Sequence, residues 1–160
     1  MKENAKETIL ILHNIRSVHN VGAIFRTADA AGVSRVYLSG YTPTPLDRFG
    51  VVRKDIAKTA LGAEKTVLWE RAKELTKLLA KLKQEHVMLI AIEQGVGAVD
   101  YKKVKAPARS AFIVGNEVRG LSRNILSRCD VIAEIPMTGK KESLNVSVAT
   151  GIGLFRMRNM

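Results

Sequence analysis

The sequence has one cysteine, Cys129, among its 160 residues. A single cysteine cannot form an intrachain disulfide or a cysteine-based metal cluster, so both are excluded. The histidines and carboxylates show no clustering along the chain either, and we expect no metal site. Cys129 lies between Arg128 and Asp130 at the start of an expected strand, which indicates a structural role.

Long apolar runs are also missing. No run approaches the roughly 20 residues that a helix needs to cross a bilayer. The first seven residues, MKENAKE, are charged where a signal peptide would have an apolar core. We therefore expect a cytoplasmic protein, in the cytosol or inside an organelle, with no membrane partner.

Aromatic residues make up only 5% of the chain, which disfavours a stacking platform for single-stranded nucleic acid. Acidic residues are scarce as well, with 15 Asp and Glu against 26 Lys and Arg, a formal net charge of +11. An excess of this size favours a nucleic-acid partner, because each phosphate contact releases counterions and gains affinity. A general contribution to solubility is the alternative.

Apolar runs alternate with helical periodicities along the chain. Strands are expected at residues 8–13, 36–38, 66–69, 87–92, 110–114 and 131–135. Helices are expected at residues 21–31, 55–61, 70–85, 123–127 and 146–158. This alternation predicts an α/β fold, a parallel six-stranded sheet with helices on both faces, Rossmann-like, in a single domain over residues 1–160. A Gly-x-Gly-x-x-Gly turn is absent after the first strand, which counts against a dinucleotide-binding enzyme.

The segment 40–50 is predicted to be a long loop, because it has Gly, Pro and aromatic residues without periodicity. Four cations, Arg48, Arg53, Lys54 and Lys58, lie in and after it. They indicate either a contact with an RNA backbone or an ordinary solvated surface.

The last expected helix is apolar on nearly every side. Val148, Ile152, Leu154 and Phe155 are more apolar surface than one sheet face can bury. An exposed patch of this kind is avoided by soluble monomers, so we expect a homodimer through this helix.

Three stretches carry the side chains with candidate chemistry. They are NVGAIFRTAD from Asn20, IVGNEVRGLS from Ile113 and IPMTGKKESLNVS from Ile135. In the third, Pro136 ends a strand and Asn145 is a suitable N-cap for the last helix. The third stretch alone also fits an ordinary strand-to-helix connection.

Together, in order and spacing over nearly the whole chain, these stretches resemble the three signature motifs of the SpoU (TrmH) family of RNA ribose 2'-O-methyltransferases, in the SPOUT superfamily. The resemblance implies S-adenosylmethionine as cofactor, held by the second and third motif loops. It implies a C-terminal trefoil knot, which general topology rules disfavour, and a dimer interface formed by the first and last helices.

The resemblance also implies the substrate class, structured RNA. Many relatives carry an additional N-terminal RNA-binding domain, and we expect no separate domain of that kind here. The choice between tRNA and rRNA stays open, as does help from an accessory protein. The alternative function is a non-catalytic RNA-binding module that retains the SPOUT fold.

The resemblance assigns candidate residues. The catalytic candidates are Arg26, Asn20, Glu117, Ser143 and Asn145. The cofactor-binding candidates are Gly115, Ile135, Leu144 and Ser143, with Ala91 and Ile92 as weaker ones.

Each candidate also has a simpler interpretation. Helix capping accounts for Asn20, Ser143 and Asn145, and a solvated loop accounts for Glu117. Arg26 is either the family's catalytic arginine or an exposed helix cation. Arginine is almost never neutral, so we favour a guanidinium that stabilises a developing alkoxide or orients a phosphate over a general base.

Overall fold

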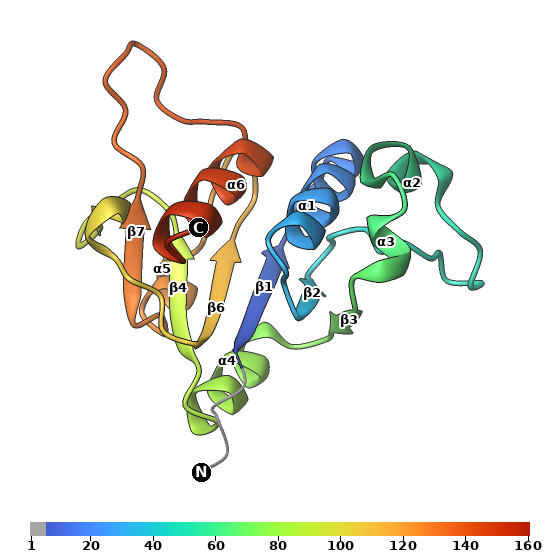
Figure 1. The fold of residues 1–160 in the computed structure, drawn as a ribbon, viewed down its shortest axis with the longest axis horizontal. Coiled ribbons are helices and arrows are strands. Elements are labelled where there is room, and N and C mark those ends of the chain that lie inside the picture. Colours follow the sequence, from blue (N-terminus) through green and yellow to red (C-terminus); the bar gives the residue numbers. More distant parts are fainter. Residues whose placement is uncertain (1–5) are drawn as a thin grey trace.

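The computed structural model describes residues 6–160 (Figure 1). Most of the charged N-terminal stretch, residues 1–5, lies outside the described residues. The strands are β1 (Glu7–His13), β2 (Arg35–Ser39), β3 (Trp69–Ala72), β4 (Met88–Ile92), β5 (Val99–Asp100), β6 (Arg109–Val114) and β7 (Val131–Glu134). The helices are α1 (Val18–Ala30), α2 (Lys54–Ala60), α3 (Ala63–Thr66), α4 (Leu75–Gln84), the 3-10 turn η1 (Tyr101–Lys103), α5 (Arg123–Leu126) and α6 (Val146–Met157).

The strands form one parallel sheet in the order β3-β2-β1-β6-β4-β7-β5. The predicted parallel α/β architecture is confirmed, but the expected number of six strands is wrong, because the sheet has seven. The additional strand is β5, two residues that pair with β7 at the sheet edge. A two-residue strand has no periodicity that a sequence pattern could reveal.

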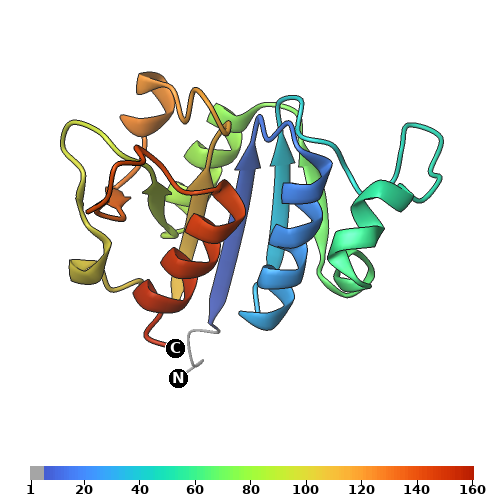
Figure 2. The same ribbon diagram turned by 90° about the horizontal axis from the view of Figure 1, so that it is seen from above.

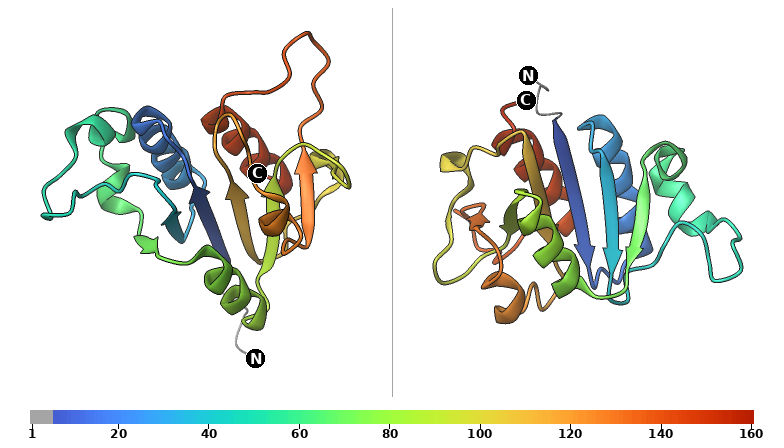
Figure 3. Two further views of the ribbon diagram at one scale, coloured as in Figure 1. Left: turned by 180° about the vertical axis from the view of Figure 1, so that it is seen from behind. Right: turned by 90° about the horizontal axis from the view of Figure 1, so that it is seen from below.

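Helices cover both faces of the sheet, as predicted. Helices α1 and α6 lie side by side on one face, and α4 and α5 lie on the other (Figures 2 and 3). The interior strand β1 contacts both layers: Leu10 and Leu12 pack with α1 and α6, whereas Ile9 and Ile11 pack with α4 and α5. The continuous apolar run of β1 is therefore the sequence of a strand buried on both faces.

The expected third strand, residues 66–69, is misplaced by three residues. Thr66 ends α3, and the strand runs from Trp69 to Ala72 at the sheet edge, where it pairs only with β2. An edge strand with a polar sequence does not stand out from the following helix, and the helix expected at 70–85 begins only at Leu75. No helix among the described residues is long and apolar enough to span a membrane.

Candidate functional site

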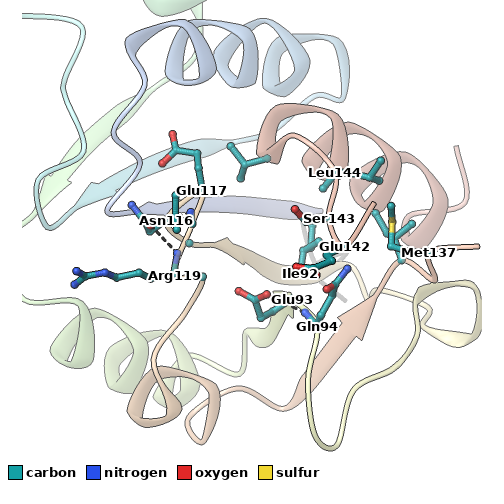
Figure 4. Close-up of a pocket in the computed structure, with 16 residues that line it drawn as sticks. Ile92, Glu93, Gln94, Asn116, Glu117, Arg119, Met137, Glu142, Ser143 and Leu144 are labelled. Carbon is teal, nitrogen blue, oxygen red and sulfur yellow. Dashed lines mark hydrogen bonds between the residues drawn. The ribbon is translucent and has the colours of Figure 1, made fainter. Parts of the chain in front are cut away.

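The loops that follow β4, β6 and β7 meet at the carboxyl edge of the sheet. Together with the start of α6 they surround a cavity of about 270 Å³ (Figure 4). In open parallel α/β sheets this edge is the usual place for a ligand. The lining residues are Ile92, Glu93, Gln94, Gly115, Asn116, Glu117, Val118, Arg119, Gly120, Ile135, Met137, Glu142, Ser143, Leu144, Val146 and Ala149.

The loop after β6 is a tight turn that forms one wall of the cavity. A Cβ atom on Gly115 would lie 2.7 Å from the backbone carbonyl carbon of Gly120, so only glycine fits there. The side-chain oxygen of Asn116 accepts hydrogen bonds from the Val118 and Arg119 amides over 3.0 and 2.8 Å. These contacts hold the second motif in one conformation without help from a ligand.

The loop after β4 is attached to the same wall. The carboxylate of Glu93 accepts a hydrogen bond from the Leu121 amide over 2.9 Å. A second oxygen of this carboxylate accepts from the Gln94 amide, also over 2.9 Å. Glu93 therefore ties two of the three loops together.

Asn20 connects the three motifs. Its side-chain nitrogen donates to the Glu117 carboxylate over 3.1 Å, and its side-chain oxygen accepts from the Asn145 side-chain nitrogen over 3.1 Å. The predicted alternative, that Asn20 caps the first helix, is wrong. The helix begins earlier, at Val18, and Ser17 is the residue that caps it.

Asn145 has both roles that the sequence left open. Its side-chain oxygen accepts from the Ser147 and Val148 amides over 2.9 and 3.4 Å, which makes it the N-cap of α6. Its side-chain nitrogen is then directed at Asn20. The cap therefore aligns the first turn of α6 with α1.

Glu117 is held at the N-terminus of α1. Its two carboxylate oxygens accept hydrogen bonds from the Arg16 and Ser17 amides, each over 3.0 Å. Burial alone would raise the pKa of Glu117, but these amides and the Asn20 side chain outweigh it and lower the pKa below its ordinary value. The simple interpretation of Glu117 as a solvated loop carboxylate is therefore wrong, because the side chain is an anchored anion at a helix N-terminus.

The structure places six of the ten candidate residues at the cavity. Asn20 and Asn145 do not line it but are joined to each other beside it, and Ala91 and Arg26 lie elsewhere. The cavity residues are Gly115, Glu117, Ile135, Ser143, Leu144 and Ile92. Ala91 is fully buried in the core layer of α4 and α5 and does not line the cavity. Arg26 lies on the exposed side of α1, outside the cavity of its own chain.

Several lining residues were not predicted from the sequence. Asn116 stands between two predicted residues of the second motif, so its position was a usable signal. Glu93 and Gln94 belong to the loop after a buried strand, which is a weaker signal of the same kind. Met137 and Glu142 lie between the predicted residues Ile135 and Ser143 of the third motif, so their positions were also a usable signal.

Comparisons with known proteins agree with this geometry. The model of the SpoU rRNA Methylase family matches residues 7–155. The 23S rRNA (guanosine-2'-O-)-methyltransferase RlmB of Salmonella typhimurium is 37% identical over 147 residues, covering 92% of this chain and 58% of that relative. RlmB of Neisseria meningitidis serogroup B is 35% identical over 158 residues, covering 98% and 60%. The chain thus spans about three fifths of the length of these curated relatives.

Solved structures have the same fold. An AdoMet-bound rRNA methyltransferase from Sinorhizobium meliloti superimposes with a TM-score of 0.84 at 30% identity, covering 99% of this chain and 58% of that one. The A. aeolicus TrmH/SpoU tRNA modifying enzyme gives a TM-score of 0.82 at 30% identity, covering 96% and 75%. With its three motifs joined around one cavity and the family model matched over residues 7–155, this chain belongs to the SpoU rRNA methylase family.

Proposed function

We propose that this protein transfers a methyl group from S-adenosylmethionine to a ribose 2'-hydroxyl of structured RNA, tRNA or rRNA. The observation that carries the proposal is the contrast between the cavity and the rest of the chain. The protein has a net charge of +11, yet three of the residues that line the cavity are glutamates, Glu93, Glu117 and Glu142. Arg119 lines it too, but its guanidinium extends away from Glu142 and Ser143 (Figure 4).

This cavity suits a cofactor with cationic groups and an apolar base. S-adenosylmethionine carries a sulfonium and an ammonium group, for which nearby carboxylates are favourable. Ile92, Ile135 and Leu144 would offer apolar surface to an adenine ring, and the tight turn at Gly115 contributes to the cavity wall. When bound, the cofactor supplies an electrophilic methyl group, and the chain has to position the ribose hydroxyl in line with it.

The reaction would form a bond from the ribose oxygen to the methyl carbon and break the bond from that carbon to the sulfonium sulfur, and the hydroxyl proton would pass to solvent water. We propose that Arg26 stabilises the developing alkoxide or orients a neighbouring phosphate, as a charged and planar donor. The bridge through Asn20 keeps Glu117 and Asn145 aligned, and with them the loops that hold Ser143 and the cofactor. Asn20, Glu117 and Asn145 thus act by positioning.

We propose further that the active protein is a homodimer in which α6 is central. Val148, Ile152 and Phe155 remain 48%, 37% and 37% exposed, and their spacing puts them on one stripe of α6. Leu154, which the sequence grouped with them, is fully buried on the opposite side of the helix. Arg26 lies on α1, the helix next to α6, and does not line the cavity of its own subunit (Figure 2). This position supports a role at the cavity of the other subunit.

The C-terminal trefoil knot is part of the same proposal. Family membership supports it, and so does the strand order: after β7, near one edge of the sheet, the chain returns to α6, which packs against β4 and β6. A cytoplasmic location is the corresponding expectation for an enzyme of tRNA or rRNA.

Two measurements test the proposal. Calorimetric titration with S-adenosylmethionine should show binding, whereas no binding at millimolar cofactor would favour the RNA-binding module. Mass spectrometry of ribonucleosides from cells lacking this protein should then show the loss of one 2'-O-methylated nucleotide, which would name the substrate. An unchanged set of methylated nucleotides would contradict the proposal.

A further inference from the structure

The loop between β2 and α2 ends in a hairpin at residues 46–52, which projects from the body of the protein (Figures 1 and 2). Leu46 and Val52 form an antiparallel bridge, and the Asp47 amide donates to the Val51 carbonyl over 2.9 Å. The Asp47 carboxylate accepts from the Phe49 and Val51 amides over 2.8 and 2.9 Å. Its own hydrogen bonds therefore hold the shape of this hairpin.

The tip of the hairpin presents an aromatic ring to solvent. Phe49 is 75% exposed, although burial is the usual state of a phenylalanine. The guanidinium of Arg48 lies over the ring, 4.7 Å from its centre. A charged group and an aromatic face held together in this way are typical of surfaces that bind nucleobases.

A cavity of about 440 Å³ is lined by residues of the hairpin, Phe49 among them, and by Tyr41 from the start of the same loop. The Tyr41 ring is 56% exposed, but its hydroxyl is fixed by a hydrogen bond of 2.9 Å from the Asn116 side chain. Arg71 braces the same loop by donating to the Gly40 and Thr42 carbonyls over 2.7 and 3.1 Å. The volume is in the range of small-ligand pockets, and two aromatic residues belong to its lining.

Tyr41 also connects this cavity with the candidate active site. Its partner, Asn116, lines the cavity that we assign to the cofactor. The two cavities are therefore joined by one hydrogen bond, and a nucleotide that flanks one placed at the first cavity would lie on the side of Tyr41. None of the three motifs contains a residue of the hairpin.

We propose that the 46–52 hairpin and Tyr41 form a binding site for an unpaired RNA base that flanks the methylated nucleotide. This inference rests on the proposed function. Stacking tolerates any base but requires that the base be out of a duplex, so the site selects a single-stranded loop or bulge of the RNA and not a base sequence.

The charges around the hairpin favour RNA over a protein as its occupant. Arg48 in the hairpin and Lys54 and Lys58 in the following helix α2 are all exposed. The two acidic groups of this region are already engaged, Asp47 by the hairpin amides and Asp55 by Arg53 over 2.7 Å. The net field is therefore positive, which suits a phosphate backbone next to the stacked base.

The test uses the full-length protein and an RNA hairpin with 2-aminopurine in its loop, compared with an RNA duplex of equal length. The wild type should quench the probe, because the base stacks. Phe49→Ala should weaken binding of the looped RNA about tenfold and reduce the quenching, with no change for the duplex. Phe49→Trp should retain both. Leu68→Ala, at a side chain that is 63% exposed outside this cavity, is the matched control and should bind as the wild type does.

Each other result has a definite meaning. Wild-type affinity for the looped RNA in Phe49→Ala would overturn the base site even if methyl transfer to RNA is found. A Phe49-dependent quenching without any methyl transfer would support the base site and contradict the proposed function. A change in mass by light scattering in Phe49→Ala, with RNA affinity retained, would identify the hairpin as a protein contact and overturn the base site.

Discussion

The side chain of Asn20 donates a hydrogen bond of 3.1 Å to the Glu117 carboxylate, across 97 positions of sequence. The contact joins the start of α1 to the turn after β6, and a second contact from the same side chain reaches Asn145 at the start of α6. The three motifs are therefore one mechanical unit. A change at any of the three residues is expected to disturb the cavity that lies beside them.

Glu117→Gln should make the protein less stable and change how its stability depends on pH. The folded pKa of Glu117 is below its ordinary value, so its contribution is fully present above the unfolded value of about 4.3 and is lost as pH falls through the folded pKa. We expect the free energy of unfolding of the variant to be about 1–2 kcal/mol lower than that of the wild type at neutral pH. On acidification the variant should then lose less stability than the wild type does, because it has no carboxylate at this position to protonate.

Urea unfolding between about pH 3 and pH 7 measures both effects. Glu142→Gln changes an exposed carboxylate on the same cavity and is the control. Equal acid sensitivity of the wild type and Glu117→Gln would show that the Glu117 carboxylate is not the group that titrates.

Arg26→Ala should leave the affinity for S-adenosylmethionine roughly unchanged and reduce methyl transfer about 100-fold or more. The reason is that Arg26 lies outside the cofactor cavity and is proposed to act on the ribose or its phosphate. Arg26→Lys keeps the charge but not the planar pair of donors, and we expect it to recover only part of the rate. Turnover at the wild-type rate in Arg26→Ala would contradict the assignment.

Mixed dimers test whether Arg26 serves the other subunit. Gly115→Ala should spoil the cavity of its own subunit, because the added Cβ would lie 2.7 Å from the Gly120 backbone. A dimer of one Arg26→Ala and one Gly115→Ala subunit then has one complete shared site, but no complete site within either subunit. Recovery of methyl transfer on mixing the two inactive proteins is the expected result.

The sequence predicted the fold and the motif residues better than it predicted the contacts between those residues. The buried strands and the helix stripe of α4 stand out because a layer on each side imposes a pattern on the chain. The two-residue β5 and the polar edge strand β3 have no such pattern, and both were missed or displaced. The bridge from Asn20 to Glu117 and Asn145 depends on long-range contacts that no local spacing encodes.

The amino-acid composition did not predict which side chains are exposed on the surface. An aromatic content of 5% argues against base stacking as an average, but stacking depends on where the rings are exposed. Tyr41 and Phe49 are both exposed within one loop. For Arg26 the sequence identifies the motif but not the site at which the side chain acts, because that site is proposed to belong to another copy of the chain.

RNA binding should weaken steeply with salt, because Lys and Arg contacts to phosphates release counterions. We expect at least a tenfold loss of affinity between about 50 and 200 mM monovalent salt, measured by fluorescence anisotropy with the looped RNA. Binding of S-adenosylmethionine involves no phosphate and should change much less over the same range. An RNA affinity that stays flat would contradict a phosphate-based interface.

Cys129 should react slowly with thiol reagents while the protein is folded. Burial, with the nearby Asp130 carboxylate, raises the pKa of this thiol to about 11, and its Sγ donates to the Ile125 carbonyl. Little thiolate is then present at pH 8, so modification should be about 100-fold slower than in guanidinium. Absorbance with an aromatic disulfide reagent gives both rates, and equal rates would show that the thiol is accessible.

Phe155→Asp should split the dimer or unfold it. Phe155 shares an exposed stripe with Val148 and Ile152, and a partner subunit pressed against this stripe would bury the new carboxylate without a counter-charge. Leu68→Asp introduces the same charge at a more exposed apolar position, 63% against 37%, and should keep the wild-type mass. Light scattering at micromolar concentration distinguishes the cases. A wild type that is a stable monomer would refute the interface, and with it the idea that Arg26 of one subunit completes the site of the other.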